Sequence, residues 1–451
     1  MEFKSLKFPK EFIFGASTAA YQIEGGAYED GKGLSIWDTF CKQPGRILNG
    51  DTGDEACDFY HRYKDDIKIM KEMGLDSFRF SISWPRVFPE GTGKVNQKGL
   101  DFYNSLVDEL RAASIEPYLT LNHWDMPQSL QDQGGWLNKD TAKHFADYSR
   151  FMCENLSDRV KFWTTHNEPH CVASAGHVAG IFAPGHKDIK EGLQVTHNLN
   201  LAHGLAVQAM RQSGSAGNKY GIVLAVFPYY PATASIHDHR AAQRWDGYFS
   251  RCFLDPIFKG SYPEDMVEYF GDKFPEVTEQ ELSVISEPID MLGINCYFRR
   301  IIENDPKNAF IGGREFKPRD AAYTQMDWPI YPECLFEVLS MLDKDYDIPE
   351  LYIIENGAAF HDEVSPDGKV HDARRTRYLH AHIEQAKRAV EQGINLKGYF
   401  VWSFLDNFEW ALGYSRRFGI VYVDYPTQKR IVKDSGKWYS ELLRYNQSLR
   451  D

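Results

Sequence analysis

Short apolar runs alternate with helical patterns along most of the chain. Eight runs are rich in apolar, β-branched and aromatic residues, which is typical of buried strands. They cover residues 12–16, 77–82, 117–121, 160–165, 220–226, 291–295, 351–354 and 397–402. Between most of them, apolar residues recur at three- and four-residue spacing, as at Phe59, Tyr63, Ile67 and Met70. Such spacing predicts amphipathic helices, and alternating strands and helices predict a parallel sheet.

Eight such units predict an α/β fold, a single (β/α)8 TIM barrel, with an open doubly wound sheet as the alternative. No GxGxxG motif follows the first run, which weakens the dinucleotide-binding interpretation. The connections 227–288 and 298–350 are long, and we expect these loops to shape a cleft at the catalytic face. Because no Ser/Gly/Pro-rich linker interrupts the chain, we expect one domain over residues 1–451.

Two of the predicted strands end in a glutamate. Glu168 follows the run 160–165 within Asn-Glu-Pro, and Glu355 follows the run 351–354 within Glu-Asn-Gly. Proline cannot continue a ladder and favours an extended residue before it, so we expect Glu168 to be the extended last residue of its strand. Two carboxylates on neighbouring strand ends of one barrel are what a glycosidase needs, one as acid/base and one as nucleophile.

Composition and charge narrow the class of protein further. The chain has 451 residues, of which 43% are hydrophobic and 14% aromatic, and its net charge of −13 argues against nucleic acid or an anionic membrane as partner. No run of 18 apolar residues and no apolar signal region are present, so we expect a cytoplasmic protein. Seven scattered cysteines without CxxC predict reduced thiols. The His-x-His pairs at 237–239 and 380–382 have no acidic or Cys company at a strand end, and neither a metal nor a cofactor is predicted.

Residues just past the predicted strands would converge at one end of the barrel. They comprise amides, one cation, one imidazole, carboxylates and indoles, which suit a hydroxyl-rich ligand whose apolar ring face stacks on Trp. A phosphate site would instead need a Gly-rich loop or Lys and Arg clusters. The residues are Gln22, Arg79, His123, Trp124, Asn167, Glu168, Asn295, Tyr297, Glu355, Asn356, Trp402, Glu409, Trp410 and Phe418.

Several motifs along the chain together resemble those of one family. They are FIFGASTAAYQIEG at 12–25, FRFSISW at 78–84, NHWDMP at 122–127, THNEP at 165–169, APG at 183–185, IENG at 354–357 and WS…DNFEW…RFG from 402 to 419. Nearly the whole chain is similar to the family 1 glycoside hydrolases, the β-glucosidase family. The resemblance implies a retaining β-glycosidase for terminal β-glucosides, with β-galactosides, β-fucosides and β-linked oligosaccharides such as cellobiose as further substrates.

The resemblance also implies roles for individual residues. Glu168 would be the acid/base and Glu355 the nucleophile, whose charge Arg79 and Tyr297 stabilise. Asn167 would bond the sugar 2-hydroxyl, Asn295 would orient Tyr297 and Glu355, and Trp402 would form the stacking floor. The rest of the pocket for the non-reducing sugar would be Gln22, His123, Trp124, Glu409, Trp410 and Phe418. The carboxylate of Glu409 would repel a sugar 6-phosphate.

Three residues depart from the usual family pattern. His166 stands where a bulky apolar residue is usual, His170 where Trp is frequent, and Cys296 where an aromatic residue is frequent. These departures leave the leaving-group preference open, and His170, His177, Phe182 and Trp328 are the candidates for that site.

Two other classes of function, as well as the oligomeric state, remain to be weighed. A catalytically silent sugar-binding protein usually lacks one of the two carboxylates, whereas both are present here. A metal-dependent barrel hydrolase would need His-x-His at the end of the first strand, where residues 16–18 are Ala, Ser and Thr. We expect small β-glycosides as partners, and homo-oligomerisation stays open.

Overall fold

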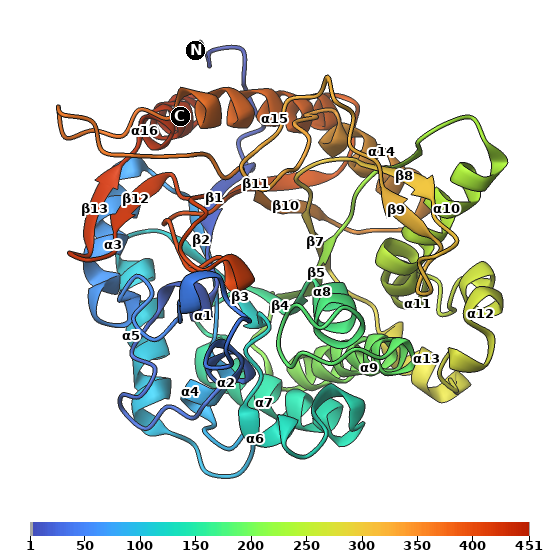
Figure 1. Cartoon of the computed structure of the whole chain (residues 1–451). Helices are drawn as coiled ribbons and strands as arrows, with labels where there is room; N and C mark the ends of the chain where they lie inside the picture. The colour runs from blue at the N-terminus through green and yellow to red at the C-terminus, as the bar shows by residue number, and fades with distance from the viewer. Residues whose placement is uncertain (1–2, 451) are drawn as a thin grey trace.

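Eight parallel strands close into a barrel in the computed structural model, which describes residues 3–450 (Figure 1). Strand β1 pairs with β2 on one side and with β11 on the other, where Ser17 lies opposite Trp402. The predicted barrel is therefore confirmed, and the open sheet is excluded. The strands are β1 (Ile13–Ser17), β2 (Ser77–Ser81), β3 (Glu116–Asn122), β4 (Phe162–Asn167), β5 (Lys219–Ala225), β7 (Met291–Asn295), β10 (Leu351–Asn356) and β11 (Leu396–Trp402).

Longer helices form a ring around the barrel (Figure 1). Helix α3 shows why: Phe59, Ile67, Met70 and Met73 are buried on one of its faces. It ends at Gly74, whose left-handed φ of 79° suits a residue without Cβ. The ring consists of α3 (Phe59–Met73), α5 (Gln97–Ala112), α7 (Asp140–Leu156), α9 (Ile189–Ser213), α14 (Cys334–Asp345), α15 (Ala373–Glu391) and α16 (Asp434–Gln447).

The two long connections contain further helices and strands rather than open loops. After β5 come β6 (Tyr229–Pro231), α10 (Ile236–Asp246), α11 (Cys252–Phe258), α12 (Glu264–Phe270) and α13 (Glu279–Ile285); after β7 come β8 (Arg300–Asn304) and β9 (Gly313–Glu315). Strands β6, β8 and β9 pair into one small sheet, which joins the two connections. Shorter elements are α1 (Ala20–Ile23), α2 (Ile36–Cys41), α4 (Trp84–Val87), α6 (Gln128–Gln131), α8 (Pro169–Cys171), β12 (Val421–Asp424) and β13 (Lys429–Val432).

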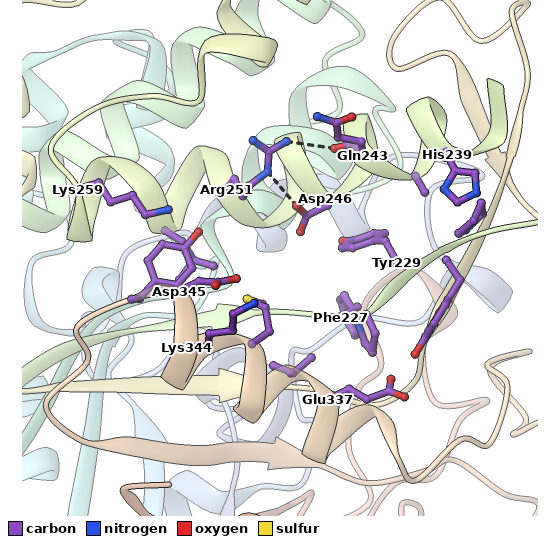
Figure 2. A pocket seen from close by; sticks show the side chains of 18 residues that line it. Phe227, Tyr229, His239, Gln243, Asp246, Arg251, Lys259, Glu337, Lys344 and Asp345 are labelled. Carbon is purple, nitrogen blue, oxygen red and sulfur yellow. Dashed lines mark hydrogen bonds and ion pairs between the residues drawn. The ribbon is translucent and has the colours of Figure 1, made fainter. Parts of the chain in front are cut away.

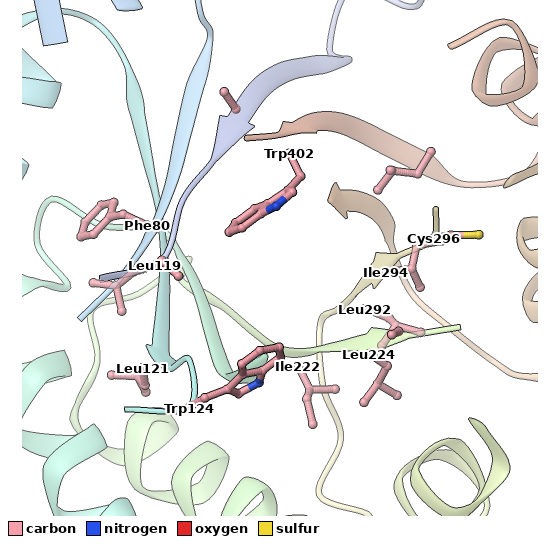
Figure 3. Packing of buried hydrophobic residues seen from close by; sticks show 14 of the residues in the cluster. Phe80, Leu119, Leu121, Trp124, Ile222, Leu224, Leu292, Ile294, Cys296 and Trp402 are labelled. Carbon is pink, nitrogen blue, oxygen red and sulfur yellow. The ribbon is translucent and has the colours of Figure 1, made fainter. Parts of the chain in front are cut away.

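Alternate residues of the strands pack into two separate apolar layers. Tyr118 of β3 lies 5.4 Å, ring centre to ring centre, from Phe400 of β11 and 5.9 Å from Tyr352 of β10. Because these strands are not neighbours, the contacts cross the inside of the barrel. Residues one position away, such as Leu119 and Ile222, belong to the layer beneath the helices (Figure 3). Successive side chains of each strand thus point alternately into the barrel and toward the helices, so both faces of the sheet are packed with apolar residues.

Both ends of the described chain meet at β1. The Tyr439 hydroxyl of α16 donates a hydrogen bond of 2.9 Å to the carbonyl of Gly15. The Asn446 side chain accepts from the N–H of Phe8 and donates to the carbonyl of Leu6, each at 3.0 Å. The two termini accordingly lie near each other in Figure 1. Within residues 3–450, no helix is both long and apolar enough to span a membrane.

The two glutamates are not on neighbouring strands, contrary to the prediction. Glu355 lies within β10 and Glu168 directly follows β4, and β5 and β7 lie between these strands in the barrel. The carboxyl ends of parallel strands nevertheless share one face of the barrel, so side chains from separated strands can meet there.

Candidate active site

The backbone at Glu168 is left-handed, with φ 43° and ψ 61°, so the prediction of an extended last strand residue is wrong. The reason lies in its neighbours, because Glu168 donates its N–H to the carbonyl of Val223 in β5 at 2.9 Å while Pro169 already begins α8. Trp124 (φ 76°) and Trp410 (φ 47°) are also left-handed. Such conformations cost about 1–3 kcal/mol each and concentrate at functional sites.

The carboxyl group of Glu168 is held by two donors. The Asn295 side-chain amide donates to Oε1 at 2.7 Å, and the Cys171 thiol donates to Oε2 at 3.2 Å. Burial, and secondly the negative charge of Glu355, raise the pKa of Glu168 to about 7. The group can therefore hold a proton near neutral pH and also release it.

Glu355 is surrounded by groups that stabilise its ionised form. Arg79 of β2 donates to Oε1 at 2.5 Å, and the Tyr297 hydroxyl donates to Oε2 at 2.6 Å. Burial raises the pKa of Glu355, whereas the Arg79 charge and the Tyr297 hydrogen bond lower it. Since Arg79 is itself fully buried, each charge compensates the desolvation of the other.

A chain of three side chains connects the two carboxyl groups. Besides its bond to Glu168, Asn295 donates to the Asn167 side-chain oxygen at 3.1 Å. Arg79, which binds Glu355, donates to the same Asn167 oxygen at 2.8 Å. Side chains from β2, β4, β7 and β10 therefore form one buried network that joins Glu168 to Glu355.

Both carboxyl groups line one cavity of about 170 Å³. This volume lies below the range of about 300–1,000 Å³ of drug-sized ligand pockets and suits a small ligand. The lining residues are His123, Trp124, Asn167, Glu168, His170, Cys171, Phe182, Phe227, Tyr297, Phe298, Arg300, Met326, Trp328, Glu355, Trp402, Glu409, Trp410 and Phe418.

Aromatic rings make one wall of this cavity. Trp410 lies 4.6 Å from Trp124 and 5.9 Å from His123 between ring centres, and the His123 ring stacks at 22° to that of Trp402. Burial, and secondly the charge of Arg79, hold the pKa of His123 well below its usual value. A neutral imidazole between indoles gives a surface on which the apolar face of a sugar can stack.

A third carboxyl group, that of Glu409, faces the same cavity. Burial and then the charges of Glu355 and Glu168 raise its pKa to about 8. Its Oε2 has no hydrogen-bond partner among residues 3–450. A ligand with hydroxyl groups would supply the missing donor.

Several predicted residues lie behind the cavity wall rather than on it. Gln22 is fully buried and donates to the carbonyl of Phe408 at 2.8 Å, which leaves its Oε1 without a partner in the described part of the chain. Arg79 and Asn295 act through the network above. His177 is fully buried in the π-helical turn Val172–Val178, where its Nδ1 contacts the carbonyl of Val172, and does not line the cavity.

Of the three departures from the family pattern, only His170 lines the cavity. The ring of His166 stacks on Phe145 at 4.5 Å and bonds the side chain of Asn122. Cys296 is fully buried and offers its carbonyl to Asn356. Of these three residues, therefore, only His170 can contact a leaving group in the cavity.

Five lining residues were not predicted from the sequence, and one of them, Cys171, comes three positions after Glu168. Phe227, Phe298 and Arg300 follow the ends of β5 and β7 by two to five positions, so their place past a strand was an available signal. Met326 comes from the connection after β9, where no pattern marks it.

A larger cavity of about 810 Å³ lies between α10, α11 and α14 (Figure 2). Arg251 there pairs with Asp246 at 2.8 Å and donates to the carbonyl of Gln243. Phe227 is the residue that this cavity shares with the smaller one. Because neither Glu168 nor Glu355 lines it, we place the chemistry in the smaller cavity.

Comparison with known proteins identifies the family to which the chain belongs. Residues 4–448 match the family described as Glycosyl hydrolase family 1. The chain is 50% identical to Beta-glucosidase A of Acetivibrio thermocellus over 98% of this chain and 99% of that protein. It is 42% identical to the Bifunctional beta-D-glucosidase/beta-D-fucosidase of Bifidobacterium breve, with 97% and 98% covered. A solved family 1 β-glucosidase from Thermotoga maritima, known also in complex with glucoimidazole, superimposes with a TM-score of 0.95 at 50% identity, covering 98% of this chain and 99% of that one.

Proposed function

The chain belongs to glycosyl hydrolase family 1 and is a glycoside hydrolase, and from this premise we propose that it is a β-glucosidase with Glu168 as acid/base and Glu355 as nucleophile. The observation that carries the assignment is that both carboxyl groups line one small cavity and are joined by the hydrogen-bonded side chains of Arg79, Asn167 and Asn295. Retaining glycosidases need their two carboxyl groups only about 5–5.5 Å apart, so that one attacks the sugar directly.

In the first half-reaction, the protonated Glu168 donates its proton to the glycosidic oxygen, and the ionised Glu355 attacks the anomeric carbon. The bond to the leaving group breaks and a glycosyl ester of Glu355 forms. Because its pKa is about 7, Glu168 can carry this proton near neutral pH. The hydrogen bonds from Arg79 and Tyr297 stabilise the ionised form of Glu355.

In the second half-reaction, the charge of Glu355 is absent because the carboxyl is esterified. The pKa of Glu168 therefore falls, and its carboxylate can remove a proton from a water that attacks the anomeric carbon. Two inversions restore the original configuration, so the released sugar keeps its β-anomeric form.

The sugar is recognised by the groups that surround this pair. Glu409 and His123 are the candidates for its hydroxyl groups, and Trp402 and Trp410 for its apolar face. Asn167, which Arg79 holds by a hydrogen bond and which lines the cavity, is the candidate for the 2-hydroxyl, an interaction that strengthens towards an oxocarbenium-like transition state.

The substrates that we propose are terminal β-D-glucosides, including β-linked disaccharides such as cellobiose. The β-fucosidase activity in the name of the Bifidobacterium breve relative supports β-fucosides as further substrates, and the Thermotoga maritima enzyme in complex with galacto-hydroximolactam supports β-galactosides. A panel of aryl β-glycosides and β-linked disaccharides, with kcat and KM for each, would rank them.

The nucleophile assignment is tested by Glu355→Ala. We expect turnover of an aryl β-glucoside to be lost and to be restored in part by azide as an α-glycosyl azide, because the small anion fills the space of the carboxylate. Glu391→Ala, an exposed glutamate of α15, is the matched control and should keep full turnover. A 2-fluoro-β-glucoside followed by peptide mass spectrometry should label Glu355. Unimpaired turnover of Glu355→Ala, or a label elsewhere, would exclude the assignment.

A further inference from the structure

We propose that Glu168, His170 and Cys171 together form a binding site for one thiophilic divalent cation, such as Zn²⁺ or Cd²⁺. Their donor atoms all lie within 4.8 Å of one another, and this is the only such group of three in the part of the chain that the structure describes. That the cation inhibits turnover rests on the proposed role of Glu168, whereas the site itself does not.

Two of the three distances between the donor atoms are close to those around a bound zinc ion. Cys171 Sγ lies 3.2 Å from Glu168 Oε2 and 3.3 Å from His170 Nε2. Tetrahedral zinc, with Zn–S of about 2.3 Å and Zn–N and Zn–O of about 2.0–2.2 Å, separates neighbouring ligand atoms by roughly 3.4–3.6 Å. Small rotations of three side chains would therefore open the site to an ion.

The backbone brings the three donors together. Cys171 donates its N–H to the carbonyl of Glu168 at 2.9 Å, which closes a single turn around Pro169. The left-handed conformation of Glu168 directs its carboxyl back over this turn, where the thiol reaches it. Three donors of three kinds, thiolate, imidazole and carboxylate, suit a borderline-soft ion such as zinc better than calcium or magnesium.

The site is open on the side of the small cavity. All three donors line that cavity, so an ion can enter by the path of the substrate and keep its fourth position for water. Cys171 is also the only one of the seven cysteines that is not fully enclosed; the others are buried. A thiophilic ion added to the folded enzyme should therefore find Cys171 first.

The charges around the cavity also favour a cation. The ionised carboxyl group of Glu355 faces it in addition to the carboxyl of Glu168. The positive charges nearby are Arg79, which is paired with Glu355, and Arg300, whose guanidinium forms an ion pair with Glu315 and lies 4.9 Å from the ring of Phe227. Because Arg300 is already paired, its repulsion is reduced.

Binding would be a reversible exchange of a proton for the ion. The Cys171 S–H bond breaks, a sulfur–metal bond forms and the proton leaves to solvent; a Glu168 carboxyl that is protonated likewise releases its proton to solvent when its oxygen binds the ion, so no oxidant or reductant is needed. An ion on Glu168 Oε2 takes the electron pair with which this carboxyl binds its catalytic proton. We therefore expect inhibition that chelation reverses.

The test uses the purified full chain after chelator treatment and removal of the chelator. Titration with CdCl₂ should produce the ultraviolet charge-transfer band of a thiolate–cadmium bond, saturating at one equivalent. Cys171→Ser should lose the band, and His170→Gln should weaken binding at least about tenfold, as loss of a ligand or its support does. Cys153→Ser, at a buried cysteine between α7 and β5, is the control and should keep the band. Cys171→Ala provides a second variant if the serine form is unstable.

Inhibition is measured in parallel by titrating aryl β-glucoside turnover with ZnCl₂, each variant relative to its own uninhibited rate. We expect the concentration for half inhibition to rise at least about tenfold in Cys171→Ser. No cadmium band in the unmodified protein, a band that survives in both Cys171 variants, or equal zinc inhibition of all variants would overturn the proposal. The absorbance needs no turnover, so it stays informative even if Glu168 and Glu355 prove not to be catalytic.

Discussion

Replacing Tyr297 by Phe removes one hydroxyl from the centre of the site while keeping the ring. That hydroxyl donates to Glu355 Oε2 at 2.6 Å in a fully buried setting. Its aromatic ring packs on Trp328 at 5.2 Å and on Phe418 at 6.4 Å between ring centres, and Phe preserves both contacts. The substitution therefore changes mainly the stability of the Glu355 negative charge.

The size of the effect follows from the hydrogen bond that is lost. A hydrogen bond to a charged group contributes about 1.5–3 kcal/mol. Because one pKa unit corresponds to about 1.36 kcal/mol, the pKa of Glu355 should rise by roughly one to two units. Glu355 must be ionised to attack, so the acidic limb of kcat/KM should move to higher pH by that amount. Arg79 remains and keeps part of the stabilisation.

The assay is the pH dependence of kcat/KM for an aryl β-glucoside. Tyr118→Phe is the matched control: its hydroxyl is equally buried, inside the barrel, but contacts the sulfur of Met291 instead of a carboxylate. We expect both variants to fold, and only Tyr297→Phe to shift the limb. The reasoning would be refuted if the acidic limb of a folded Tyr297→Phe enzyme lay within about 0.3 pH units of that of the unmodified enzyme. Such a difference is well short of the shift expected from a charged hydrogen bond.

Three further predictions address the acid/base, the buried cation and the barrel closure. In Glu168→Gln, the fall of kcat/KM as pH rises through about 7 should disappear. Turnover of glucosides with poor leaving groups should decrease more than turnover of activated aryl glucosides. An unchanged basic limb in the pH profile of kcat/KM would assign that limb to another group. Arg79→Met leaves Glu355 without its ion-pair partner, and breaking a buried pair costs about 3–5 kcal/mol. In steady-state kinetics kcat/KM should therefore fall roughly 10²- to 10⁴-fold, and a loss under tenfold would contradict this. Tyr439→Phe should lower the free energy of unfolding in urea by about 0.5–1.5 kcal/mol with kcat unchanged, because its hydroxyl bonds only backbone of β1 and β11; a changed kcat would show that this end of the barrel reaches the site.

The barrel was predictable because its signal is local. Each strand is a short apolar run, and each predicted helix carries its apolar residues at helical spacing. Helix α14 shows the same signal in Leu335, Val338 and Leu342, yet it lies inside a long connection where it was not expected. Glu355 could be placed because its strand simply continues through it.

The parts that could not be predicted depend on contacts between distant segments. The left-handed turn at Glu168 results from its bond to Val223, 55 positions away along the chain, and proline alone suggested the opposite. Asn295 could be suspected from its strand end, but its hydrogen bonds to Asn167 and Glu168 required the barrel order. His177 lies close to the site in sequence, but its side chain is buried in a π-helical segment and does not line the cavity.

The meeting of the chain's two ends at β1 has a consequence for biosynthesis. Strand β1 needs β11 as its second neighbour, and α16 then binds the carbonyl of Gly15 through Tyr439. A ribosome synthesises the chain from its N-terminus at about 5–20 residues per second. Strand β1 therefore cannot pair with β11 until the other barrel strands have been synthesised. Trp402, at the end of β11, arrives equally late. A nascent or C-terminally clipped polypeptide would therefore be unable to digest glycosides, and activity would report on complete translation.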